Sequence, residues 1–331
     1  MNKLKKLYIE PSSSCNLNCA MCFRNGWIDE KQELMTAETR ERIIRSIPYC
    51  KNLRTVMFAG MGEPLMYPEI FDMVADVSAL GISTHLLTNV TLLDRERTDE
   101  LLKCGLDMLW VSVDGFSKES YERIQLGSQY DLVLKNLSYF TAHKGNCRLG
   151  ITFVIMKENE EELSKINSFA DMLGADEINL SYAIPSVPTK EKNTLYSSDV
   201  SIGKMIRFTK QKVRRKLNLC PFVDEGVTFV KANGDVCPCM QLLHSSYTYL
   251  FDEKRMVHSC SFGNINEESL SDIWNEKSYS KFREKVKKFE FPDCTLCDGC
   301  DDRLENQTDC MFNSFPTCGA CLWAQGVARC P

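Results

Sequence analysis

The chain has 331 residues, of which 44% are hydrophobic and 26% are charged, and its net charge is −5. This length and composition are typical of a globular protein with one large and one smaller domain. The absence of a basic excess argues against nucleic-acid binding. No apolar run approaches the length of a membrane span, and the first thirty residues lack the apolar segment of a signal peptide. We therefore expect a cytoplasmic protein that binds neither nucleic acid nor a membrane.

Short apolar segments alternate with helical patterns from the N-terminus to about residue 185. The first predicted helix begins after Thr36, a good N-cap residue, and later helices end at Gly81, Gly105 and Gly174, which is typical of helix C-termini. Strands are predicted over residues 6–11, 53–60, 82–89, 107–115, 148–157 and 177–185, and helices over 36–47, 69–81, 94–105, 130–145 and 161–174.

This alternation predicts an α/β fold with a parallel sheet and crossover helices. Six units in about 185 residues are too few for a closed barrel of eight, which needs roughly 250 residues. We therefore expect a partial (β/α)6 barrel like an incomplete TIM barrel, with a small cysteine-rich C-terminal domain; a flat doubly wound sheet is the alternative. The predicted boundaries are 1–190 for the barrel, 191–218 for a linker with a basic helix, and 219–331 for the C-terminal domain.

Polar and glycine-rich stretches follow the first four predicted strands. They are SSSCNLNCAMC after the first, AGMGEP after the second, TN after the third and SVDG at the fourth. Because the C-terminal ends of parallel strands meet at one rim, where such folds carry their chemistry, these stretches are expected to form a single site.

Three cysteines, Cys15, Cys19 and Cys22, follow the first strand in the spacing C-x3-C-x2-C. Three thiolates on a four-iron cluster leave one iron free for a substrate or cofactor, by analogy with catalytic metal sites that keep an open position. The alternatives are a zinc site with a distant fourth ligand, and buried free thiols.

Eleven of the seventeen cysteines lie between Cys220 and Cys330. Disulfides seldom persist in the cytoplasm, so metal ligation is the natural interpretation, and thiolate-rich sites select zinc or iron–sulfur clusters. A zinc-ribbon-like interaction module is the alternative to iron–sulfur clusters. Cys50, Cys104 and Cys147 are isolated and are interpreted as small apolar residues.

The trio with GMGEP, TN and SVDG at successive strand ends resembles the radical S-adenosylmethionine (SAM) enzymes over residues 5 to 185. The resemblance implies a four-iron cluster on the trio that binds SAM, and reductive cleavage of SAM to a 5′-deoxyadenosyl radical. The SAM-binding residues implied by the matching motifs are Met21, Phe23, Gly60, Gly62, Glu63, Thr88, Asn89, Ser112, Asp114 and Asn159. The sequence departs from the family pattern at two positions. Met61 replaces the first glycine of the GGEP motif. Gln125 occupies the position of an arginine found in many relatives, and Arg123 is the residue expected to substitute for that arginine.

The C-terminal region resembles the SPASM domain, which binds auxiliary iron–sulfur clusters. Cys220, Gly234 and Cys239 match the opening C-x9–15-G-x4-C, and a hairpin is predicted around Asn233-Gly234. We expect one auxiliary cluster on Cys220, Cys239 and Cys310 with Cys237 or Cys260 as the fourth ligand. A second is expected on Cys294, Cys297 and Cys300 with Cys318 or Cys321.

The tail, CTLCDGCDDRLENQTDC and FPTCGACLWAQGVARCP, is similar to radical SAM/SPASM proteins associated with tungsten-dependent aldehyde oxidoreductases. The resemblance implies a maturase of a peptide or protein, such as that oxidoreductase, served by an electron donor such as ferredoxin or flavodoxin. The alternatives are an enzyme that introduces thioether or carbon–carbon crosslinks into a small ribosomal peptide, and a non-catalytic metal-binding adaptor.

Overall fold

The computed structural model describes residues 3–28, 31–184, 186, 218–250, 253–297 and 299–325. The linker and basic helix predicted over 191–218 lie outside the described residues except for residue 218, and so does Cys330.

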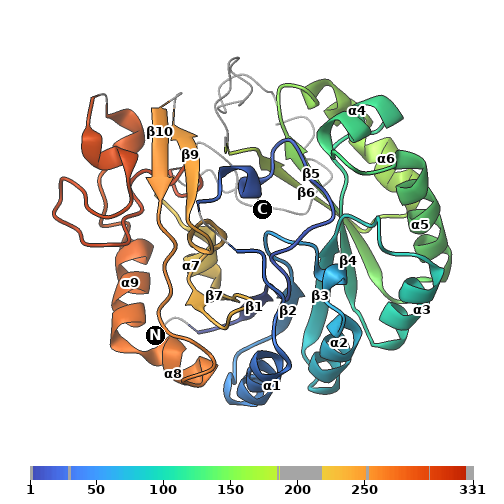
Figure 1. Ribbon diagram of the computed structural model, residues 1–331, viewed down its shortest axis with the longest axis horizontal. Coiled ribbons are helices and arrows are strands. Elements are labelled where there is room, and N and C mark those ends of the chain that lie inside the picture. Colours follow the sequence, from blue (N-terminus) through green and yellow to red (C-terminus); the bar gives the residue numbers. More distant parts are fainter. Residues whose placement is uncertain are drawn as a thin grey trace.

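One eight-stranded sheet organises the protein, in the order β6-β5-β4-β3-β2-β1-β7-β8 (Figure 1). Neighbouring strands from β6 to β7 pair in parallel, and only β8 is antiparallel to its neighbour. The six predicted strands are β1 (Lys6–Ile9), β2 (Thr55–Phe58), β3 (Ser83–Thr88), β4 (Met108–Ser112), β5 (Arg148–Ile155) and β6 (Glu177–Tyr182). The predicted α/β class and partial barrel are confirmed.

The helices between these strands cover the outer side of the sheet (Figure 1). They are α1 (Ala37–Ser46), α2 (Ile70–Ala79), α3 (Arg95–Lys103), α4 (Lys118–Ile124), α5 (Tyr130–His143) and α6 (Ile166–Leu173). Thr36 caps α1 as predicted, because its hydroxyl accepts from the backbone N–H of Thr39. Helix α4 was not predicted, because its seven residues are too few to show a helical period. A capping box formed by Ser117 and Ser120 begins it.

The main hydrophobic core lies between the sheet and the helices. Leu7, Ile9, Val56 and Phe58 are fully buried there, and their alternation along β1 and β2 places the intervening residues on the concave inner face. Burial of large aliphatic and aromatic side chains stabilises such a core by about 1.5–3 kcal/mol for each residue.

Two strands from the C-terminal region complete the sheet. β7 (Val227–Val230) pairs in parallel with β1, with Tyr8 opposite Phe229, and β8 (Val236–Cys237) returns antiparallel to it. The hairpin predicted around Asn233-Gly234 is therefore confirmed, and Gly234 takes a φ of 92° that favours glycine. Its attachment to the barrel sheet was not anticipated.

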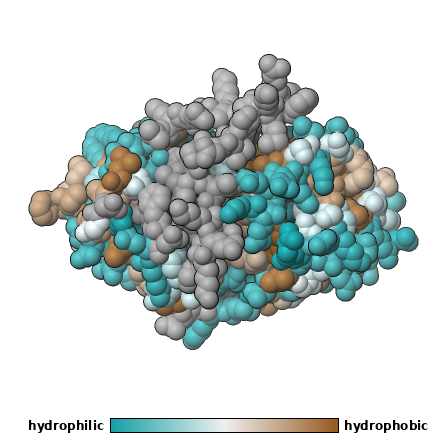
Figure 2. All heavy atoms as spheres, turned by 90° about the horizontal axis from the view of Figure 1, so that it is seen from above, coloured by the Kyte–Doolittle hydropathy of each residue, from teal (hydrophilic) through white to brown (hydrophobic). Residues whose placement is uncertain are grey.

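The remaining C-terminal elements stand beside β1 and β7 (Figure 1). They are α7 (Pro221–Glu225), β9 (Ser246–Leu250), β10 (Glu253–Val257), α8 (Leu270–Asn275) and α9 (Lys277–Lys288). A search of the described residues for helices long and apolar enough to cross a membrane finds none. From above, the described surface is mostly hydrophilic, with hydrophobic residues in small separate patches (Figure 2).

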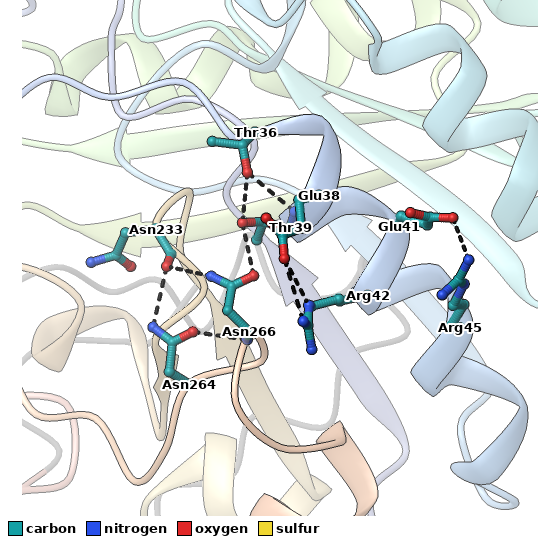
Figure 3. A network of polar contacts seen from close by, with 9 residues as sticks. All are labelled: Thr36, Glu38, Thr39, Glu41, Arg42, Arg45, Asn233, Asn264 and Asn266. Carbon is teal, nitrogen blue, oxygen red and sulfur yellow. Dashed lines mark hydrogen bonds and ion pairs between the residues drawn. The ribbon is translucent and has the colours of Figure 1, made fainter.

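A network of amides joins the hairpin turn to α1 (Figure 3). Thr39 Oγ1 donates to Asn266 Oδ1 over 3.1 Å, and the Nδ2 groups of Asn266 and Asn264 both donate to the carbonyl of Asn233 over 3.2 Å. The C-terminal region is thus fixed to the barrel by hydrogen bonds as well as by the shared sheet.

Candidate active site and cysteine clusters

The loop that carries the first three cysteines leaves β1 and is held from two sides. The backbone N–H of Asn18 donates to the carbonyl of Leu126 over 3.0 Å, and that of Ala20 donates to Ile124 over 2.8 Å. On the other side, the N–H of Glu63 donates to the carbonyl of Ser14 over 2.8 Å. The segments after β1, β2 and β4 therefore form one rim, as the sequence predicted.

The three thiols of this loop are close enough to act on one another electrostatically. Burial raises the pKa of Cys15, Cys19 and Cys22, and Asp114 and the other two thiols raise that of Cys19 further. Cys15 Sγ also lies 3.8 Å from Asn89 Nδ2. Such buried thiols disfavour the thiolate form until a metal provides compensating positive charge.

Glu63 links the rim segments after β2 and β3. Its Oε1 accepts from Thr88 Oγ1 over 2.8 Å and from the N–H of Leu65 over 3.0 Å, while Oε2 accepts from the N–H of Asn89 over 2.9 Å. The side chain is buried, and this burial raises its pKa. The carboxylate thus fixes Thr88 and Asn89 and retains lone pairs for an ammonium donor.

The two glycines before Glu63 allow the segment after β2 to approach the end of β1 and the cysteine loop closely. A Cβ on Gly62 would lie 2.2 Å from the carbonyl oxygen of Ser12 and 2.5 Å from that of Ser14. A Cβ on Gly60 would lie 2.4 Å from Cγ of Glu10. Gly62 therefore lets the GMGEP segment lie directly against the cysteine loop.

Asp114, Ser112 and Gln125 form a second polar group at the end of β4. Asp114 Oδ2 accepts from Gln125 Nε2 over 2.8 Å and from Ser112 Oγ over 3.2 Å, and burial raises the pKa of this carboxyl to about 6. Gln125 is 1% exposed, and its Oε1 has no hydrogen-bond partner within the described part of the chain. A buried acceptor left open beside the cysteine loop fits a ligand that donates a hydrogen bond.

The other expected SAM contacts lie in different surroundings. Arg123 is exposed, and its guanidinium reaches the carbonyl of Glu158 over 3.5 Å, so Gln125 rather than Arg123 contacts Asp114. Asn159 is buried and donates to the carbonyls of Asp114 and Val154, which fixes the end of β5. Met21 is half-buried, and Phe23 meets Trp323 of the C-terminal segment edge-on with 5.9 Å between ring centroids.

Four half-buried C-terminal cysteines gather around one cavity. Cys220, Cys239, Cys318 and Cys321 line it together with aromatic residues that include Phe222 and Trp323. Burial raises the pKa of all four thiols, and the charges of Cys220, Cys318 and Cys321 raise that of Cys239 further. We call these four residues the inner set.

A second group lies nearer the surface. Cys294 is buried, and its pKa is raised by burial and then by Asp309, Cys297 and Cys310. Cys297 and Cys310 are exposed, and Cys300 follows within the same loop. The neighbouring Leu296, Met311 and Phe312 are also exposed. We call Cys294, Cys297, Cys300 and Cys310 the outer set.

This grouping differs from the expected allocation. Cys310 lies with Cys294 and Cys297 instead of with Cys220 and Cys239, and Cys318 and Cys321 belong to the inner set. The cause is a chain reversal after Cys310: the N–H of Thr317 donates to Asn306 O over 2.9 Å, and Leu219 N–H donates to Ala324 O over 3.1 Å. These bonds return the tail to the start of the region, which linear spacing cannot reveal.

Cys237 stands apart from the inner set, whereas the charge of Cys260 raises the pKa of the inner cysteine Cys318. Cys237 is buried on β8, and the charged groups that act on it are Lys231, Asp235, Cys260 and Glu10. This placement does not favour Cys237 as a ligand of the inner set. The thiols of Cys50, Cys104 and Cys147 contact no other cysteine that the structure describes.

Glu10 and His244 also lie at this site and were not predicted from the sequence. Glu10 Oε1 accepts from the N–H of Met61 over 2.6 Å, and Oε2 lies 2.8 Å from His244 Nε2, with both side chains buried. Trp27, just beyond the cysteine loop, packs against His244 with 4.4 Å between ring centroids and an angle of 31° between the ring planes. The signal available in the sequence is a charged residue, Glu10, at the end of a buried strand.

The donor chemistry of the three cysteine groups fits iron–sulfur clusters. Within the described ranges, no three His, Cys, Asp or Glu residues are grouped so as to hold one metal ion. Thiolates that bind the separate iron atoms of one cluster stand farther apart than ligands of a single ion. Three interacting thiols at the rim and four around the inner cavity provide the all-cysteine donor sets that such clusters use.

Two family descriptions match the chain. Residues 9–170 match the radical SAM superfamily, and residues 220–301 match the iron-sulfur cluster-binding domain called SPASM. Among curated proteins, the chain is similar to the tungsten-containing aldehyde ferredoxin oxidoreductase cofactor-modifying protein of Pyrococcus furiosus. The two are 30% identical over 99% of this chain and 97% of that protein. This chain is also 23% identical to the AdoMet-dependent heme synthase of Methanosarcina barkeri, over 93% of this chain and 94% of that protein.

Solved structures share the fold. Streptococcus suis SuiB bound to S-adenosylmethionine matches 89% of this chain and 71% of its own, with a TM-score of 0.62 and 18% identity. The protein anSMEcpe with bound AdoMet and the Cp18Cys peptide matches 88% and 86% of the two chains, with a TM-score of 0.62 and 19% identity.

Proposed function

Because this chain belongs to the radical SAM superfamily, we propose that it is a maturase that modifies a tungsten-dependent aldehyde oxidoreductase or the cofactor of that enzyme. Radical SAM enzymes use a [4Fe-4S] cluster and SAM, which supply a 5′-deoxyadenosyl radical that removes a hydrogen atom from the substrate. The observation that carries the proposal is the 30% identity, over nearly the whole of both chains, to the cofactor-modifying protein of Pyrococcus furiosus.

Cys15, Cys19 and Cys22 are the proposed ligands of the SAM-binding cluster. Glu63 is proposed to accept from the SAM amino group, because its buried carboxylate lies at the rim and is held by Thr88 and Asn89. Gln125 Oε1, a buried acceptor without a hydrogen-bond partner among the described residues, is proposed to accept from a second donor of SAM. Ser112 and Asp114 orient the Gln125 amide for this contact, which replaces the arginine of many relatives.

The inner and outer sets are proposed to hold one auxiliary [4Fe-4S] cluster each. Each set offers four cysteines, so both clusters would be fully ligated by protein, which favours electron transfer over direct substrate binding. The half-buried inner set lies toward the barrel, where Trp323 meets Phe23, and the outer set includes two exposed cysteines. A donor such as ferredoxin or flavodoxin is proposed to supply the electron for SAM cleavage.

A small ribosomal peptide is the second candidate substrate. The match to anSMEcpe, whose structure contains the Cp18Cys peptide, favours a fold able to admit one. The experiment offers the anaerobically reconstituted enzyme two substrates in parallel: the metal-containing oxidoreductase made without its maturase, and cysteine-rich peptides encoded beside the gene.

SAM consumption and a mass change confined to the oxidoreductase or its extracted cofactor would support the proposal. Modification of a peptide alone would favour the second candidate. The double variant Cys50→Ala/Cys104→Ala serves as the control, because it removes two thiols that lie outside the three cysteine groups and should modify the same substrate at the wild-type rate.

A further inference from the structure

A buried arginine lies against the loop that joins Cys300 to Cys310 of the outer set. Arg255 lies on β10 and is only 3% exposed. Its Nε donates to the carbonyl of Arg303 over 2.9 Å and its Nη2 lies 3.4 Å from the carbonyl of Glu305. No carboxylate of the described residues forms an ion pair with it, so its charge is balanced by backbone dipoles in this arrangement.

Thiols of both sets act on this guanidinium. Burial lowers the pKa of Arg255, whereas the charges of Cys321, Cys294 and Cys318 raise it. In return, Arg255 lowers the pKa of each of these three thiols. Two of them belong to the inner set and one to the outer set, so one cation acts on both.

The two sets are also in direct contact through the backbone. The N–H of Cys294 donates to the carbonyl of Gly319 over 3.2 Å, and a Cβ on Gly319 would lie 2.8 Å from Cys294 Sγ. Gly319 directly follows Cys318 of the inner set in the chain. The backbone next to this inner cysteine therefore contacts Cys294 of the outer set. A single buried charge can therefore affect both sites at short range.

We propose that Arg255 is a shared positioning residue that raises the reduction potentials of both auxiliary clusters. A cluster bound by thiolates is negatively charged and becomes more so when it gains an electron, so a buried cation stabilises the reduced form. Leaving this guanidinium without a carboxylate costs desolvation energy, which the negative clusters offset. The inference rests on the proposed binding of clusters by both sets.

The test uses the full chain with Cys15, Cys19 and Cys22 replaced by alanine, so that only auxiliary clusters remain. Iron is counted first, and about eight irons per chain are expected for two clusters. The reduction potential of each cluster is then measured by a titration followed by electron paramagnetic resonance. Arg255→Gln and Arg255→Met remove the charge with different side chains, and Arg255→Lys retains it.

Both charge-removing variants should shift both potentials to more negative values, while Arg255→Lys stays close to the parent. Arg283→Gln is the matched control: Arg283 is a second buried arginine of this region, packed on Trp274 and Tyr279, and should leave both potentials unchanged. If the Arg255→Gln variant loses its iron, the potentials are measured in Arg255→Met, which removes the same charge.

Equal potentials in the parent and in the charge-removing variants would overturn the inference, and so would a shift confined to one cluster or an equal shift in Arg283→Gln. A parent protein without about eight irons would instead overturn the binding of auxiliary clusters, which separates the two failures.

Discussion

Replacing Gly62 by alanine tests how closely the GMGEP segment and the cysteine loop must pack. The added Cβ would lie 2.2 Å from the carbonyl oxygen of Ser12 and 2.5 Å from that of Ser14, and both atoms belong to backbone. One of the two segments must therefore move by about 1 Å to restore a van der Waals contact. Overpacking of this kind costs about 1–3 kcal/mol of the free energy of unfolding.

A displacement of about 1 Å between groups that position a reacting molecule can cost about 100-fold in rate. We therefore expect Gly62→Ala to form 5′-deoxyadenosine about 100-fold more slowly than wild type. Formation is measured by chromatography after addition of dithionite and SAM, and unfolding is followed in urea.

Gly81→Ala is the matched control for this experiment. Gly81 has a φ of 71°, and no atom lies within 4 Å of its added Cβ. Alanine there should cost about 1–2 kcal/mol through backbone strain and leave the rate unchanged. The reasoning is refuted if Gly62→Ala cleaves SAM at the wild-type rate, or if Gly81→Ala loses as much activity.

Three further outcomes are expected. In chelator-treated, reduced protein, Asp114→Asn should raise the free energy of unfolding by about 3 kcal/mol at pH 8 and by less at pH 5. Burial raises the pKa of the folded carboxyl to about 6, so the cost of its ionisation is fully present above that value and is lost as the pH falls from there to the unfolded pKa of about 4. Urea titrations that give the same difference at both pH values would contradict this. Gln125→Leu should weaken SAM binding about 10-fold in equilibrium dialysis, whereas the surface change Arg123→Leu should not, and equal affinities for the two variants would refute the assignment. Cys239→Ala should lose about four irons and Cys237→Ala none, and iron loss in the Cys237 variant would show that the inner set is drawn incorrectly.

The sequence was informative about the rim of the barrel because its signals are local. Helix-ending glycines at positions 81, 105 and 174 and the polar stretches after four apolar segments are consecutive in the chain. Parallel order then places the ends of those strands together without any knowledge of long-range contacts. The loop after β1, Glu63 and Asp114 could therefore be located from the sequence.

Long-range pairings carried no such signal. β7 joins β1 across more than two hundred positions of sequence, and the apolar pattern of VTFV alone fits a separate domain equally well. The membership of the inner and outer sets depends on a chain reversal fixed by Asn306 and Thr317, which spacing does not encode. The Glu10–His244 contact likewise joins residues distant in sequence, so neither could be assigned a partner beforehand.

The central claim is tested most directly by an iron count and an assay for SAM cleavage in one anaerobically reconstituted sample. The account predicts about twelve irons per chain and formation of 5′-deoxyadenosine, with cleavage lost and about eight irons retained when Cys15, Cys19 and Cys22 are changed to alanine. Zinc in place of iron, or a full complement of clusters without cleavage, would contradict it and leave a metal-binding adaptor as the better description.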